Sequence, residues 1–271
     1  MTPIFQEAAI SVLLTSDPAG KAFRARAVAA LWRAGKLRFA PDWDGSVPER
    51  PARPRAPVLV PPAQVPRRRL STAAGRAALL HAVAHIEFNA IDLAVDMAVR
   101  FARSSELDAS ARSAFITDWL TVGDDEARHF MMVTDRLGEL GTAYGDLEAH
   151  DGLWEAAMAT SDDIAARLAV APLVLEARGL DVTPAMINRL NSAGDDASAG
   201  VLEIIYHEEI GHVSCGRRWL DHVCERRSEN PRETFHRLVR ERFPGGLKLP
   251  VNALARAAAG LEPDFYEALL P

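Results

Sequence analysis

Apolar residues recur at three- and four-residue intervals along most of the chain, with polar residues between them, which is the pattern of amphipathic α-helices. This pattern predicts an all-α protein. Long helices are expected at residues 71–103, 108–140, 153–178 and 195–227. Shorter helices are expected at residues 19–35, from Pro184 onward, at 231–241 and at 251–259.

Proline is distributed in a way that supports these predictions. Eight of the 17 prolines lie between Pro41 and Pro66, whereas none lies between Arg67 and Ala171. An interior proline destabilises a helix by about 3 kcal/mol, so a proline-free stretch of this length favours long helices. The proline-rich segment is expected to be a mostly extended connector that lies across the main body.

The connections between the long helices predict their arrangement. A short link after residue 103 makes the first two helices antiparallel neighbours. Residues 141–152 can span about 40 Å when extended, which matches a helix of about 27 residues, so they can form a crossover along a bundle. We therefore predict a ferritin-like four-helix bundle with one long crossover. Its expected range is 71–227, with an N-terminal helical arm and connector at 1–70 and short C-terminal helices at 228–271.

Composition excludes several classes of protein. The chain has 271 residues, of which 48% are hydrophobic and 25% charged, as in an ordinary soluble globular protein. The two cysteines, Cys215 and Cys224, are too few for a disulfide framework or a four-thiolate zinc site. The N-terminus lacks the pattern of a secretory signal, and no uninterrupted apolar run reaches about 18 to 20 residues. A cytoplasmic protein with no membrane partner is expected.

Two Glu-x-x-His motifs lie on predicted long helices, at Glu126–His129 and Glu209–His212. A spacing of three places both side chains on one helical face, where they can bind one metal ion. The neighbours at offsets of three, four and seven from each glutamate are mostly apolar. A third Glu-x-x-His sequence, Glu233–His236, has charged and polar neighbours at the same offsets, so we interpret it as part of a solvated helical face.

Each of the other two long helices has one glutamate whose neighbours at offsets of three, four and seven are also mostly apolar. These glutamates are Glu87 and Glu176. Four carboxylates facing a bundle core without partners would cost many kcal/mol, more than the usual net stability of a domain, about 5 to 15 kcal/mol. Two divalent cations would balance the four negative charges. Oxygen and imidazole donors favour two iron ions, or alternatively manganese or a mixed manganese and iron pair. The predicted metal ligands are Glu87, Glu126, His129, Glu176, Glu209 and His212.

Four further residues are candidates for the surroundings of these ligands. Asp125 and Glu208 each precede a ligand glutamate, where an acid can bond the outer nitrogen of a ligand histidine, although a solvated charge is an equal alternative. Tyr206 lies one turn before Glu209, with packing as the simpler role. His85 is interpreted as structural or as part of the outer shell.

Four segments carry a resemblance to a known group: residues 85–93, 125–129, 175–181 and 208–212. They resemble an uncharacterised bacterial family, a domain of unknown function, in the ferritin-like superfamily, and the likeness extends to residues 243–266. The Asp-Glu-x-x-His form is more distantly similar to the ribonucleotide reductase small subunit, di-iron monooxygenases and tRNA-hydroxylating enzymes. The resemblance implies a ferritin-like fold, and the six predicted ligands match the superfamily pattern.

The leading functional hypothesis is a di-iron carboxylate oxidoreductase that activates dioxygen to oxidise or hydroxylate an unidentified small molecule, using an unknown electron donor. Glu126 and Glu209 are the expected bridging ligands. Trp119, Phe130, Phe88 and Ile205 are the expected pocket lining. Iron storage, peroxide consumption and tRNA hydroxylation are alternatives. A monomer or homodimer favours the enzyme, because storage needs a cage.

The net charge of −6 conceals an uneven distribution of charge. Residues 1–70 contain 12 basic and 5 acidic side chains, a balance of +7, and the remaining 19 basic and 32 acidic side chains give −13. The basic arm could bind RNA through Arg67, Arg68 and Arg69. Docking of the arm on the acidic body explains the same asymmetry and is the favoured interpretation.

Overall fold

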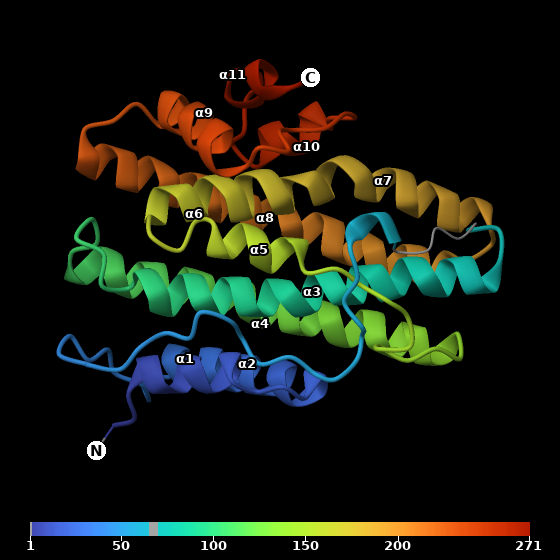
Figure 1. The fold of residues 1–271 in the computed structure, drawn as a ribbon, viewed down its shortest axis with the longest axis horizontal. Helices are drawn as coiled ribbons and strands as arrows, with labels where there is room; N and C mark the ends of the chain where they lie inside the picture. The colour runs from blue at the N-terminus through green and yellow to red at the C-terminus, as the bar shows by residue number, and fades with distance from the viewer. Residues whose placement is uncertain (1, 65–69) are drawn as a thin grey trace. The chain divides into compact units, whose positions relative to one another are not determined.

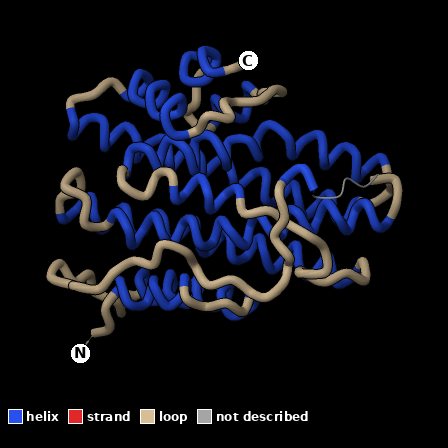
Figure 2. The backbone as a smooth tube through the Cα atoms, in the orientation of Figure 1, coloured by secondary structure: helices blue, strands red, loops and turns tan. Residues whose placement is uncertain are grey.

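The protein is all-α in a computed structural model that describes residues 2–64 and 70–271. Within that described part the chain forms helices and loops, without an extended β-strand, and only isolated bridges join Ile4 to Arg38 and Leu59 to Ala149 (Figure 2). The predicted all-α class is confirmed. The chain divides into two compact units, Met1–Arg103 with Leu107–Trp154, and Ser104–Glu106 with Glu155–Pro271. The domain division predicted from the sequence is not tested by these units and stays a prediction.

An antiparallel helix pair, α3 (Ala73–Phe101) and α4 (Ala109–Glu139), forms the centre of the first unit (Figure 1). Each helix begins behind a side chain that accepts hydrogen bonds from free N–H groups of the first turn. Thr72 accepts from the N–H of Gly75, and Asp108 accepts from those of Ser110 and Ala111. The predicted helices at 71–103 and 108–140 are confirmed to within two residues at each end.

Two arm helices complete the core of the first unit. Helix α1 (Phe5–Leu13) packs on α3, and α2 (Pro18–Arg33) packs on α4 and α1. Helix α2 matches the helix expected at 19–35, whereas α1 was not predicted separately. Val28 of α2 is buried in this core, whereas Phe23 is 75% exposed.

A buried ion-pair network attaches the arm to α3. The ammonium group of Lys21, fully buried, donates to both carboxylate oxygens of Asp92 at 2.5 and 2.7 Å and to the carbonyl of Ala52 at 3.1 Å. Arg53 of the connector donates to the same carboxylate and, at 2.5 Å, to Oδ1 of Asn89. Two cations from residues 1–70 thus converge on one buried acid of the helix pair.

Exposed ion pairs continue this attachment of the basic arm. Arg26 and Arg33 both bond Asp124 of α4, at 2.9 and 2.7 Å, and Arg50 bonds Asp151 at 2.7 Å. These pairs support the interpretation that the arm docks on acidic groups. Arg67, Arg68 and Arg69, the candidate RNA contacts, lie outside the described residues.

The second unit is built around α8 (Asp196–Arg227), which packs against α7 (Ala177–Ser192), α6 (Ile164–Val170) and the π-helical segment η2 (Ala171–Glu176). Helix α8 begins after Asp195, which accepts a hydrogen bond from the N–H of Ser198, and it is followed by Ser228, whose backbone is left-handed. The chain ends with α9 (Pro231–Arg242), α10 (Ala253–Ala258), α11 (Pro263–Tyr266) and the 3₁₀ turn η3 (Glu267–Leu269).

The third long helix differs from its prediction. The segment expected as one helix at 153–178 is divided into α5 (Gly152–Met158), α6 and η2, because Asp163 caps a new helix and Pro172 lacks a backbone N–H. Conversely, α7 runs through Pro184, where a new helix was expected to start. The predicted boundaries were wrong at both places.

Helix α3 is the one helix among the described residues that is long and apolar enough to cross a membrane by length and composition. Its most apolar 18-residue window has a mean hydropathy of 1.3, and 78% of that window is buried inside the structure. A buried helix of this kind is the pattern of a core helix in a soluble protein. Buried acids at Glu87, Asp92 and Asp96 agree with that interpretation.

Replacement of the central acid of the network, Asp92→Asn, is predicted to destabilise the protein by about 3 to 5 kcal/mol, because it leaves two cations without their shared carboxylate. Urea unfolding followed by circular dichroism measures this loss. The matched control is Arg50→Gln, which removes an exposed pair and is expected to cost less than about 1 kcal/mol. Equal effects of the two substitutions would contradict the central role of Asp92.

Candidate metal centre

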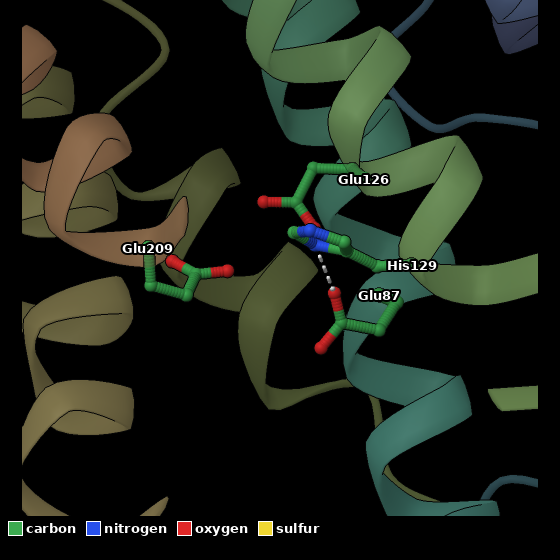
Figure 3. A group of neighbouring side chains, drawn as sticks. All are labelled: Glu87, Glu126, His129 and Glu209. Atoms are coloured by element: carbon green, nitrogen blue, oxygen red, sulfur yellow. Dashed lines mark ion pairs between the residues drawn. The ribbon is translucent and has the colours of Figure 1, made fainter. Parts of the chain in front are cut away.

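Three predicted ligands come together in the first unit. Glu87 projects from α3, and Glu126 and His129 project from successive turns of α4 (Figure 3). Nδ1 of His129 lies 3.2 Å from a carboxylate oxygen of Glu87 and 3.7 Å from one of Glu126. The three side chains can each offer one ligand atom, and these atoms lie within 4.8 Å of one another. Figure 3 also draws Glu209, which belongs to the second unit.

These three side chains are among the most buried polar groups of the first unit. Exposed fractions are 4% for Glu87, 1% for Glu126 and 0% for His129. The surrounding positions on α4 include Trp119, Val122, Phe130 and Val133, all of them buried. The apolar face that the sequence predicted is therefore confirmed for this part of the site.

The charge state of His129 follows from its neighbours. Burial by itself lowers the pKa of this imidazole, but the polar contacts and negative charges of Glu126 and Glu87 outweigh burial and raise the pKa to about 11. Without a metal ion, His129 is a cation between two carboxylates at neutral pH. A metal ion that binds Nδ1 must displace this proton.

The second unit holds a second Glu-x-x-His pair with closely similar internal geometry. Nδ1 of His212 lies 3.6 Å from Oε1 of Glu209, compared with 3.7 Å in the pair of α4. His212 is 4% exposed, and the Glu209 side chain is 12% exposed. Both motifs thus present a carboxylate and an imidazole from one helical face.

Glu176 occupies a special position in the second unit, at the last residue of the π-helical segment η2. Single π-turns inside helices occur frequently at functional sites. Pro172 initiates the irregularity because it cannot donate the hydrogen bond of a regular turn. Glu176 is predicted by its apolar neighbours in the sequence, whereas the π-turn was not predicted, although a proline inside a helical pattern is a signal for such an irregularity.

The ring of Pro172 in η2 packs closely on the backbone of α8 at Gly216. A Cβ atom at Gly216 would lie 2.4 Å from both Cβ and Cγ of Pro172 and 3.4 Å from Leu173. Gly216 lies one turn after His212 on the same face of α8. The packing that positions the Glu176 segment therefore depends on a residue without a side chain.

The four candidate outer residues have different surroundings. Asp125 bonds Arg128 at 3.2 Å and is about one third exposed, and Glu208 is partly buried. The hydroxyl of Tyr206 accepts from Asn252 at 3.0 Å, which supports a packing role. His85 contacts the hydroxyl of Tyr144 and the carbonyl of His150, and these contacts agree with the structural role among the two that were predicted for it. A role for Asp125 or Glu208 beside the ligands stays a prediction.

The aromatic residues expected to line a substrate pocket are buried. Phe88 and Phe130 pack with ring centroids 5.5 Å apart, and both contact Tyr144. Trp119 packs edge-on against Phe115, and Ile205 is buried in the second unit. Their place around a substrate stays a prediction.

These observations define the class: an all-α protein with a buried carboxylate and histidine cluster that can bind metal ions. The chain belongs to the family described as "Protein of unknown function (DUF455)", whose model matches residues 14–267. An uncharacterized protein of Haemophilus influenzae is 44% identical over 207 residues, which cover 76% of this chain and 72% of that protein. No solved structure matches the chain significantly.

The metal-free protein is predicted to lose stability as the pH rises from about 7 toward 11. The pKa of His129 in the folded protein, about 11, lies above its usual value of about 6.5. Its ion pairs therefore stabilise the fold fully at pH values below about 6.5, and this stabilisation is lost progressively as the pH rises through 11. Urea unfolding of the chelator-treated protein at several pH values measures this loss.

The variant His129→Gln should have a flatter pH profile over the same range. The exposed histidine of α8, His207, supplies the control, and His207→Gln should keep the profile of the unchanged protein. Identical profiles for the unchanged protein and His129→Gln would contradict the assigned charge state.

The substitution Gly216→Ala is predicted to destabilise the protein by about 1 to 3 kcal/mol, because its methyl group overlaps Pro172 and forces the packed segment apart. Gly211→Ala on the same helix is the matched control. Apart from its chain neighbours and the adjacent backbone of α8, no described atom lies within 4 Å of a Cβ there, so alanine should stabilise α8 by up to about 1 kcal/mol. Chemical unfolding compares the two, and equal stability would contradict the close approach.

Proposed function

We propose that the protein is a di-iron carboxylate oxidoreductase that uses dioxygen to oxidise or hydroxylate a small organic molecule. The observation that carries the proposal is the buried group of Glu87, Glu126 and His129, whose donors are carboxylate oxygens and an imidazole. Such donors suit iron or manganese, whereas a thiolate site would favour softer metals. Both described cysteines lie on α8 and neither belongs to the group.

The ligand set proposed for two metal ions consists of the three residues of the first unit together with Glu176, Glu209 and His212. Three features support the second set. The Glu209–His212 pair repeats the internal geometry of the α4 pair, Glu176 ends a π-turn, and the sequence supplies one glutamate and one Glu-x-x-His motif in each half. This composition is characteristic of di-iron and di-manganese carboxylate proteins of the ferritin-like class.

Bound iron would supply the redox chemistry needed to activate dioxygen. The residues of this chain have separate tasks. The carboxylates hold the cations and offset their charge, His129 gives up its proton when a metal binds, and the apolar positions around α4 exclude water from the site. A cytoplasmic location and a monomeric or homodimeric state accompany the proposal.

Anaerobic loading with ferrous iron is predicted to give about two iron ions per chain by elemental analysis. Loss of a group that only supports a ligand typically reduces metal affinity by about 10- to 100-fold. Because Glu126 is a proposed direct ligand, Glu126→Ala should reduce the affinity for iron by more than this. The chain supplies a matched control in Glu233→Ala, which alters the exposed Glu-x-x-His match on α9 and should leave iron binding unchanged. Fewer than one iron ion per chain would exclude the proposed centre.

Rapid mixing of the reduced, iron-loaded protein with dioxygen separates the proposed enzyme from other ferritin-like activities. The expected result is oxygen consumption with a fast change in iron-centred absorption, both lost in Glu126→Ala. Size-exclusion chromatography should show a monomer or dimer. A large cage-like particle that accumulates ferric iron would indicate storage, and oxygen release from added peroxide would indicate a peroxide-consuming protein.

A further inference from the structure

The first unit contains a second feature suited to ligand binding, a pocket of about 320 Å³ between the connector and α3. Its walls include Arg53, Arg55, Pro57 and Leu59 of the connector, His85 of α3, and Tyr144 of the crossover. This volume lies at the lower end of the range for small-molecule sites, about 300 to 1,000 Å³.

Backbone bonds hold the connector wall of this pocket in place. The N–H of Ala149 donates to the carbonyl of Val58 at 3.0 Å, and the N–H of Val60 donates to the carbonyl of Ala149 at 2.8 Å. Lys21 bonds the carbonyl of Ala52 just before the pocket. These contacts order the pocket before any ligand binds, so binding loses less conformational entropy than it would in an unstructured segment.

Positive charge predominates around the pocket. Arg53 and Lys21 share the carboxylate of Asp92, so this network carries a net charge of +1. Arg55 is exposed at the pocket wall and adds a second positive charge. Among the described residues that line the pocket, none is acidic.

The side chains of His85 and Tyr144 form a fixed aromatic part of the pocket wall. Nδ1 of His85 lies 2.9 Å from the hydroxyl of Tyr144, and Nε2 lies 3.0 Å from the carbonyl oxygen of His150 and 3.1 Å from Nδ2 of Asn89. Polar contacts at both ring nitrogens hold the imidazole in one orientation.

The pocket is distinct from the metal centre. Two residues apart on an α-helix correspond to a rotation of about 200°, so His85 and Glu87 lie on nearly opposite sides of α3. Their contacts agree, since His85 bonds Tyr144 and Glu87 lies beside His129.

We propose that this pocket binds a small organic anion, whose carboxylate or phosphate group lies beside Arg53 and Arg55 and whose apolar body lies against Pro57, Val58 and Leu59. Arginine recognises both anion types through paired N–H donors. Three apolar connector residues, of which Val58 is 62% exposed and Leu59 42% exposed, supply the surface that an aliphatic or aromatic body would cover.

Isothermal titration of the full-length protein with three six-carbon probes tests this proposal. Hexanoate and hexyl phosphate carry the two candidate anionic groups, and hexan-1-ol is the neutral control. The expected result is saturable binding of at least one anion and at least about tenfold weaker binding of the alcohol, because the alcohol lacks the charge that strengthens a hydrogen bond from arginine. The tighter of the two anions identifies the ligand class.

Variants at exposed positions show whether the anion occupies this pocket. Arg55→Gln and Val58→Glu should each weaken binding of the tighter anion by about tenfold, and neither should alter the thermal unfolding temperature appreciably. Arg50→Gln removes an exposed arginine that pairs with Asp151 outside the pocket lining, and it should leave binding unchanged.

Three results would overturn the proposal: no saturable binding of either anion, equal binding of the alcohol, or unchanged binding by Arg55→Gln and Val58→Glu. Glu126→Ala should bind the probe as the unchanged protein does. The pocket and the proposed iron centre therefore succeed or fail separately, because anion binding needs no metal and iron loading needs no anion.

Discussion

Burial of acidic side chains along α3 is the constraint on which the rest of the first unit depends. Glu87, Asp92 and Asp96 are 4%, 0% and 0% exposed, and a buried carboxylate without a cation costs several kcal/mol. Lys21 and Arg53 approach Asp92, Arg100 bonds Asp96 at 2.8 Å, and His129 lies beside Glu87. The arm, the connector and α4 are therefore joined to α3 by charge as well as by apolar packing.

The group of Glu87, Glu126 and His129 differs from the other two buried acids of α3 in the kind of cation beside it. Lys21 and Arg53 lie beside Asp92 and Arg100 lies beside Asp96, whereas Glu87 and Glu126 lie beside the imidazole of His129. The positive charge of an imidazole comes from a proton that a metal ion can displace. A divalent cation in its place would bring two charges and keep the imidazole as a donor, which lysine and arginine side chains do not allow.

Sequence periodicity predicted the features that are local to single helices. The bounds of α3, α4 and α8 were predicted to within two residues from periodicity, and in the structure the capping side chains of Thr72, Asp108 and Asp195 lie directly before these periodic segments. The burial of Glu87, Glu126 and His129 followed from apolar neighbours one and two turns away. The π-turn that ends at Glu176 was not predicted, nor was the packing of Pro172 on Gly216, which lies 44 positions further along the chain. Tertiary contacts of this kind leave only an isolated proline and an isolated glycine as signals.

The pocket could not be predicted from the sequence at all. Connector residues 53–59 have no periodicity, and Tyr144, which lines the pocket with them, lies in another irregular segment. Helix α3 relates the two sites physically. His85 and Asn89 face the connector and crossover, while Glu87 faces α4, so one helical register positions both sets. That register is fixed by the Lys21–Asp92 pair, whose buried atoms cannot shift by a residue without separating a cation from its anion. The ion pair between Lys21 of the arm and Asp92 therefore fixes the position of α3, the helix that carries the first predicted metal ligand, Glu87.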